Sequence, residues 1–233
     1  MTTLNIFCAG AGQAVVSRLA AEMERESGLH FNAEYGAVGA MKARVLSGAA
    51  TDIVVLTAAL IDELIAVSEI DVATRVDLGK VGTGVAVRTG TPQADVGSVD
   101  RLREQVLAAT RIVCPDPAVA TAGKVVLKVL DQLGVAAEVT PRLQYFPNGY
   151  AAMANLAQSS GAHEMGITQV TEILANPGVT LIGPLPDAVQ NMAVYTAGVA
   201  TRSAHATLAH EFIRRLTAVE AQAGLRAAGF VVG

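Results

Sequence analysis

The chain has 233 residues, of which 52% are hydrophobic and 16% are charged, and its formal net charge is −4. These values are typical of a globular protein with a large buried core. The negative charge, the absence of Trp and the scarcity of aromatic residues exclude a nucleic-acid interface, which requires a basic surface and stacking side chains. No apolar run reaches the roughly 18 residues that a membrane span requires, so no membrane-spanning segment is expected.

Short apolar runs, bounded by Gly, Pro, Asn and Asp, alternate with amphipathic segments along the whole chain. The predicted strands are residues 4–8, 30–35, 53–57, 82–88, 111–114, 139–145, 165–168, 179–184 and 192–199. The predicted helices are residues 13–27, 39–47, 59–68, 100–109, 122–133, 149–159, 205–218 and 220–228. This alternation predicts an α/β protein with right-handed crossovers.

A turn-rich break, Thr89-Gly90-Thr91-Pro92, separates two strand–helix sets, and the last helices are expected to return to the first set. We therefore expect two lobes, residues 1–82 plus 196–233 and residues 83–195. Each lobe is predicted to be a mainly parallel sheet flanked by helices, with a ligand cleft between the lobes.

Two turns of small residues follow the first two strands, and a helix begins directly after each turn. In a parallel sheet, such turns present backbone N–H groups and a positive helix end to a small anion. The candidate ligand-binding residues are Gly10, Ala11, Gly12, Gln13, Tyr35, Ala37, Val38 and Gly39, with Thr57 at the end of the third strand. The alternative is that the small residues only permit tight helix–strand packing, with Gln13 in solvent.

Similar turns in the second half supply further candidates. Thr121, which precedes a predicted helix, either donates to a ligand or caps that helix. Asn148 has the same two alternatives, and Gly149 follows it at the start of the next helix. His163 and Glu164 precede a strand, so we expect them at its amino end, on the surface and away from the site.

The remaining reactive residues indicate neither a metal nor a cofactor. Cys8 and Cys114 lack metal-ligand or redox spacing and are expected to be buried thiols. Four scattered histidines give no metal site, and no GxGxxG or P-loop pattern indicates a nucleotide cofactor. No basic region precedes the first strand, which predicts a cytoplasmic protein, or a periplasmic one from which a signal peptide was removed.

Several short motifs resemble those of a known family in content and order. They are Phe7-Cys8-Ala9-Gly10-Ala11, Gly48-Ala49-Ala50-Thr51-Asp52-Ile53, Asp116-Pro117-Ala118 with Ala122-Gly123, Met165-Gly166-Ile167-Thr168, and Glu220-Ala221-Gln222 with Gly229-Phe230. Together they resemble the substrate-binding proteins of bacterial molybdate importers, which have the type II periplasmic-binding-protein fold. The resemblance spans nearly the whole chain.

The sequence departs from that family where molybdate binders place hydroxyl groups. The two serines and the tyrosine of the family correspond here to Ala11, to the turn of Ala37, Val38 and Gly39, and to Gln169. The missing donors favour an organic carboxylate over a tetrahedral oxyanion, because each charge-assisted bond contributes about 1.5–3 kcal/mol. Gln169 is thereby a further ligand candidate, and Glu172 is interpreted as a first-turn helix carboxylate.

The same resemblance extends to an enzyme branch of the family, aconitate isomerase, and implies a cofactor-free isomerase of a small di- or tricarboxylate. An allylic proton transfer requires a base, for which Cys8, Lys42 and Tyr195 are the candidates, with Cys114 and Tyr35 as alternatives. Lys42 could instead neutralise a substrate carboxylate. The competing hypotheses are a non-catalytic solute-binding protein that delivers an organic anion or molybdate-like oxyanion to an ABC permease, and an enzyme acting on another acid, such as a keto–enol tautomerase.

Overall fold

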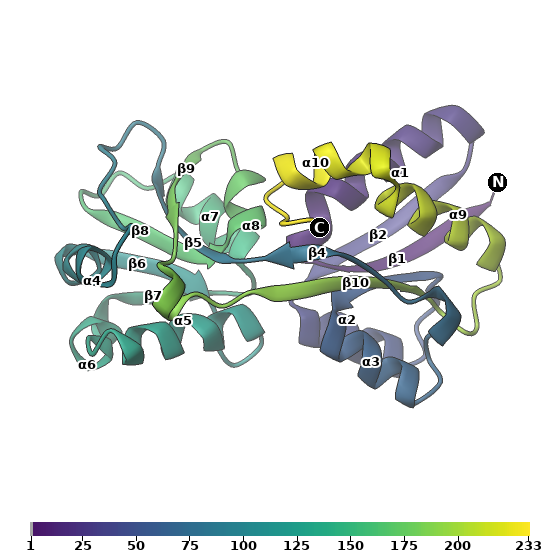
Figure 1. The fold of residues 1–233 in the computed structure, drawn as a ribbon, viewed down its shortest axis with the longest axis horizontal. Coiled ribbons are helices and arrows are strands. Elements are labelled where there is room, and N and C mark those ends of the chain that lie inside the picture. Colours follow the sequence, from purple (N-terminus) through teal and green to yellow (C-terminus); the bar gives the residue numbers. More distant parts are fainter. Residues whose placement is uncertain (1) are drawn as a thin grey trace. The chain divides into compact units, whose positions relative to one another are not determined.

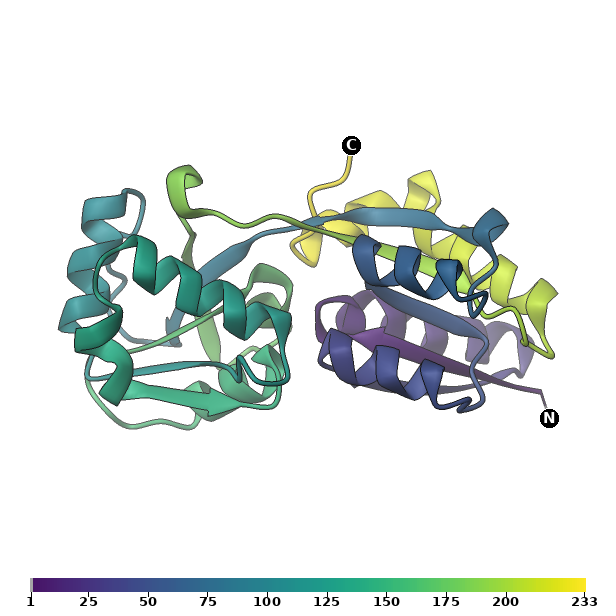
Figure 2. The ribbon, with the colours of Figure 1, turned by 90° about the horizontal axis from the view of Figure 1, so that it is seen from below.

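A computed structural model describes residues 2–233, which divide into two compact units (Figure 1). Unit 1 comprises the residues up to Val81 together with Ala193–Gly233, and unit 2 comprises Gly82–Met192. The chain passes between the units twice, after Val81 and after Met192 (Figure 2). The sequence-based boundaries place residues 193–195 in the second lobe, but strand β10 (Ala193–Val199) begins there and pairs with strands of unit 1.

Unit 1 contains a five-stranded mixed sheet of order β2-β1-β3-β10-β4. Besides β10, its strands are β1 (Thr3–Ala9), β2 (His30–Gly36), β3 (Ile53–Thr57) and β4 (Val76–Val81). Strand β1 is parallel to β2 and β3, whereas β10 is antiparallel to β3 and β4. Four strands therefore run in one direction, so their carboxyl ends meet at one edge of the sheet.

Helices cover both faces of this sheet, as parallel connections require. Figure 1 shows α1 (Gln13–Ser27), α9 (Ala206–Thr217) and α10 (Gln222–Ala227) on one face, and α2 (Val38–Leu46) and α3 (Ala58–Ala66) on the other. Short 3-10 turns span Gly10–Gly12, Val72–Thr74 and Val219–Ala221. Gly28 ends α1 in the left-handed conformation, at φ 68°, as a C-cap glycine does.

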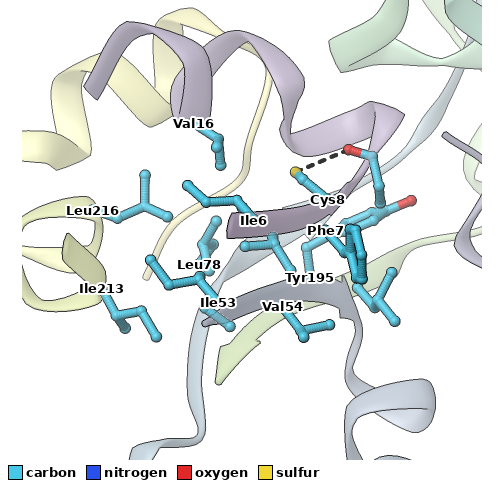
Figure 3. Close-up of a cluster of buried hydrophobic side chains, with 14 of the residues drawn as sticks. Ile6, Phe7, Cys8, Val16, Ile53, Val54, Leu78, Tyr195, Ile213 and Leu216 are labelled. Carbon is cyan, nitrogen blue, oxygen red and sulfur yellow. Dashed lines mark hydrogen bonds between the residues drawn. The ribbon is translucent and has the colours of Figure 1, made fainter. Parts of the chain in front are cut away.

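The core of unit 1 follows from the alternation of side chains along β1 (Figure 3). Cys8 lies on the α1 side of the sheet, beside Gly12, whereas Phe7 lies on the α2 side, where the Arg44 guanidinium is 5.3 Å from its ring centroid. Both faces of the strand are buried, which explains why the sequence there is a continuous apolar run.

Unit 2 repeats this arrangement with a sheet of order β7-β6-β8-β5-β9. Its strands are β5 (Thr83–Arg88), β6 (Arg111–Pro115), β7 (Leu143–Phe146), β8 (Glu164–Gln169) and β9 (Val179–Pro184). Strand β6 is parallel to β7 and β8, and β5 is antiparallel to β8 and β9. Again four strands run one way, and the single reversed strand is next to the edge of the sheet.

Two hydrophobic clusters lie on the two faces of this second sheet. One contains buried residues of α4 (Val99–Ala108), α5 (Thr121–Gln132) and α6 (Ala136–Val139), and the other those of α7 (Gly149–Ala157) and α8 (Val170–Leu174). Neighbouring residues of β6 divide between them: Cys114 packs in the first cluster and Val113 in the second. Further 3-10 turns span Thr140–Arg142 and Asp187–Val189.

Two predicted elements differ from the structure. The strand predicted at residues 139–145 begins only at Leu143, because α6 and the turn Thr140–Arg142 occupy the preceding residues. Strand β4 was missed, since Asp77, Gly79 and Lys80 interrupt the apolar pattern; its pairing with β10 contains a register shift between Tyr195 and Thr196. At β4, pairing with β10 outweighs local propensity.

Candidate functional site

Three strand–helix junctions meet at one edge of the unit 1 sheet, which we call the unit 1 loop edge (residues 9–13, 36–38 and 57–58). Cys8 pairs with both Tyr35 and Val55, so the ends of β1, β2 and β3 lie side by side. Helices α1, α2 and α3 start directly after these strands. The antiparallel strand β10 brings Tyr195 to the same edge, opposite Thr57.

The N-cap residues of α1, α2 and α3 contribute no side-chain cap. Their N-cap residues are Gly12, Ala37 and Thr57, and no side-chain cap hydrogen bond forms at any of them. By contrast, Ser98 caps α4 by accepting a hydrogen bond from the Arg101 N–H. Uncapped first turns carry N–H donors and the positive helix end, which together favour an anion.

The structure thus brings the unit 1 ligand candidates together. Gly10, Ala11 and Gly12 form the 3-10 turn before α1, Gln13 is the first residue of α1, and Ala37, Val38 and Gly39 form the start of α2. Thr57 immediately precedes α3. Burial raises the pKa of Tyr35 despite its hydrogen bond to Ser17, so its phenol stays protonated at neutral pH.

Cys8 is not suited to act as a base. Its side chain is fully buried, and burial raises the pKa of the thiol. The Sγ atom donates to the carbonyl oxygen of Ala9 at 3.2 Å (Figure 3). Burial likewise raises the pKa of Cys114, to about 12, so both cysteines are the buried thiols of the alternative interpretation.

The other two predicted bases are also engaged in the structure. Lys42 forms an ion pair with Glu63 of α3. Tyr195 is 4% exposed and packs edge-to-face on Phe230, with ring centroids 6.3 Å apart. Of the three, Lys42 is the least buried.

Unit 2 has an equivalent edge, which we call the unit 2 loop edge (residues 115–121, 146–149 and 169–170); strands β6, β7 and β8 end there. Thr121 is the first residue of α5 and does not cap it; Ala120 holds the N-cap position without a side-chain hydrogen bond. Gly123 is required here, because a β-carbon would lie 2.3–2.7 Å from backbone atoms of residues 115–117. The start of α5 is therefore an uncapped helix end supported by a tight turn.

Side chains of the protein itself contact the first turn of α7. The Asn148 side chain accepts from the Ala151 N–H at 2.8 Å, as a helix cap does. The carboxyl group of Glu172 lies against Gly149, and the Thr168 hydroxyl donates to it at 2.6 Å. Of its two alternatives Asn148 therefore takes the cap, and the ligand candidate Gly149 lies against the carboxyl group of Glu172.

Glu172 has the helix position that the sequence predicted and further contacts that the sequence did not predict. It does stand in the first turn of α8, but it is 5% exposed and hydrogen-bonds to the N–H groups of Gly149, Gln169 and Tyr150. Burial raises its pKa, and these three N–H groups and the Thr168 hydroxyl act in the opposite direction. Gln169, at the N-cap of α8, is also buried, at 7% exposure.

His163 and Glu164 lie at the amino end of β8, at the opposite end from Gln169, as expected. His163 is exposed, and Glu164 forms a half-buried ion pair with Arg111 at 2.8 Å. Among residues 2–233, no cluster of three or more His, Cys, Asp or Glu side chains could hold a metal ion. No helix in that range is long and apolar enough to cross a membrane.

The sequence profile described as "Bacterial extracellular solute-binding protein" matches residues 4–231, nearly the entire chain. The chain belongs to this family. The periplasmic molybdate-binding protein of Azotobacter vinelandii superimposes with a TM-score of 0.82 at 21% identity, over 99% of both chains. A sulfate-binding protein from Mycobacterium tuberculosis gives 0.72 at 19% identity, over 99% of this chain and 86% of the other.

A curated relative of this solute-binding protein carries an enzyme name. The aconitate isomerase of a Pseudomonas species is 24% identical over 242 residues, which cover 98% of this chain and 87% of the relative. The fold expected from the sequence, two α/β lobes of the periplasmic-binding-protein type, is thus confirmed.

Proposed function

We propose that this solute-binding protein binds a small organic di- or tricarboxylate through the backbone N–H groups of its loop edges. The observation that carries the proposal is the set of uncapped helix starts. Helices α1, α2 and α3 in unit 1 and α5 in unit 2 all begin after strand ends, and the N-cap residue of each forms no side-chain cap.

The donor set favours carboxylates over a tetrahedral oxyanion. Ala11 and Gln169 stand where the molybdate-binder pattern has hydroxyl-bearing residues, and Ala37 and Val38 start α2 without a hydroxyl. Backbone N–H groups arranged in first turns suit a planar carboxylate, which accepts several donors through two oxygens. The protonated phenol of Tyr35 adds a further donor next to the unit 1 loop edge.

Allylic isomerisation of the bound acid is a second candidate function, favoured by the full-length likeness to an aconitate isomerase. In that reaction a base removes a proton from one allylic carbon, the charge delocalises toward a carboxylate, and a proton returns at the other carbon. N–H donors at helix starts would stabilise the delocalised charge. Lys42 is the candidate base that we retain, since it is the least buried of the three; its ammonium group must leave the ion pair with Glu63 and give up a proton before the nitrogen can accept one.

The proposal is tested with tricarballylate, citrate and cis-aconitate as probes. We expect each bound acid to raise the melting temperature, since a ligand at 100 times Kd stabilises by about 2.7 kcal/mol. Incubation with cis-aconitate, followed by proton NMR, then separates the candidates: appearance of the trans isomer indicates an isomerase, and binding without conversion indicates a solute receptor that would serve an ABC permease. No thermal shift with any of the acids contradicts the proposal.

The cytoplasmic location expected from the sequence stays a prediction. It is checked by expressing the gene from its natural start in the native cell and fractionating the compartments. Recovery in the periplasm would favour the receptor function.

A further inference from the structure

Glu172 belongs to α8, but its carboxyl group lies at the start of a different helix, α7. The hydroxyl of Thr168 donates to it at 2.6 Å, and the N–H groups of Gly149 and Tyr150, the first two residues of α7, also hydrogen-bond to it. A β-carbon at residue 149 would overlap Glu172 Oε2 and Thr168 Oγ1. The glycine therefore permits the carboxyl group to approach the helix start.

Two helices of at least two turns, α5 and α7, begin at the unit 2 loop edge, and their first turns differ in what occupies the N–H groups. Helix α5 begins without a side-chain cap, whereas α7 has both the Asn148 cap and the buried carboxyl group of Glu172. A planar carboxyl group with three backbone N–H partners and one hydroxyl partner has the contacts that a bound oxyanion would have at such a position.

We propose that Glu172 determines specificity in this protein: its carboxyl group occupies the anion position at the start of α7, which restricts ligand anions in unit 2 to the start of α5. The consequence for the ligand rests on the proposed function. The occupancy of the α7 start does not, and it can be tested separately.

The test removes the carboxyl group and supplies a small one from solution. Glu172→Ala is expected to lower the melting temperature, and sodium formate is expected to restore it in a saturable manner, by about 5 °C at saturation. Wild-type protein and Glu138→Ala, which removes an exposed carboxyl group of the same unit, are expected to gain no such shift over sodium chloride of equal ionic strength. An equal formate response in all three proteins would overturn the proposal.

Glu172→Gln keeps the volume and decides the question if Glu172→Ala fails to fold. We expect its amide resonances at Gly149, Tyr150 and Gln169 to move in ¹⁵N-correlated NMR spectra while that of Gly123 stays in place, and we expect no formate response because the position is filled. Unchanged resonances, or a saturable formate response, would overturn the proposal. Lack of tricarboxylate binding by the wild type would contradict the proposed function and leave both of these results unaffected.

Discussion

Gly12 lies against Cys8 so closely that a β-carbon at residue 12 would be 2.8 Å from the Sγ atom. This contact joins the first turn of α1 to the end of β1 and places the N–H groups of the unit 1 loop edge. It also buries the Cys8 thiol, so this potentially reactive side chain serves only to pack the strand against the helix. Small residues at this turn therefore serve packing: Ala11 and Gly12 are buried, and Gly10 is half-buried.

Gly12→Ala is expected to lower the free energy of unfolding by about 1–3 kcal/mol, because overpacking a filled site forces neighbouring atoms to move. The penalty should be much smaller in a Cys8→Ala background, since the sulfur is the atom in the way. Urea unfolding of the two single variants and the double variant measures this coupling. Equal penalties in both backgrounds would show that the Cys8 sulfur is not the cause of the destabilisation by a β-carbon at residue 12.

Neither cysteine is expected to be reactive in the folded protein. Both thiols are buried with raised pKa values, so the nucleophilic thiolate is scarce at pH 8. Ellman's reagent should titrate two thiols in urea and react far more slowly under native conditions. Cys8→Ala should retain ligand binding and any isomerase activity, and a loss of turnover with intact binding would restore Cys8 as a catalytic candidate.

The stability of the protein should depend on Glu172 in a pH-dependent way. Since the pKa of Glu172 is raised in the folded state, its stabilising contribution is fully present below the ordinary value of 4.5 and is lost as pH rises through the raised value. The unfolding free energy of the wild type minus that of Glu172→Gln should therefore fall with rising pH. Chemical denaturation at several pH values measures the difference, with Glu138→Gln reporting the general effect of removing one carboxyl group. A difference that rises with pH would contradict burial as the dominant influence.

Variants of Lys42 and of its partner Glu63 distinguish a surface ion pair from a catalytic base. If it only pairs with Glu63 near the surface, Lys42→Met and Glu63→Gln should each change stability by less than about 1 kcal/mol and ligand affinity by less than about threefold. A role as base predicts instead that Lys42→Met abolishes cis-aconitate conversion while Glu63→Gln retains it. Parallel calorimetry and NMR turnover assays on the two variants separate these outcomes.

The sequence was sufficient to predict the strand–turn–helix junctions because each combines an apolar run, small residues and an immediate amphipathic segment. It was not sufficient at positions where a distant contact decides. Nothing near Glu172 in the chain indicates that it reaches Gly149, and the short spacing to its own helix start suggested a local role. Asn148 was correctly weighed as a cap or a ligand group, and only the hydrogen bond to Ala151 decides between them.

The central claim is that backbone N–H groups at uncapped helix starts bind the ligand. Proline at the first helical position removes one N–H with little harm to the helix, and both Ala37 and Ser98 already have the extended backbone that a following proline requires. Val38→Pro therefore deletes a donor at the start of α2, and Val99→Pro makes the same change at the start of α4, outside both loop edges.

The most direct measurement is calorimetric titration of tricarballylate into the wild type and these two variants. A lost charge-assisted bond of about 1.5–3 kcal/mol predicts at least about tenfold weaker binding for Val38→Pro and wild-type affinity for Val99→Pro. Equal affinity in all three proteins, or no saturable binding by the wild type, would contradict the claim.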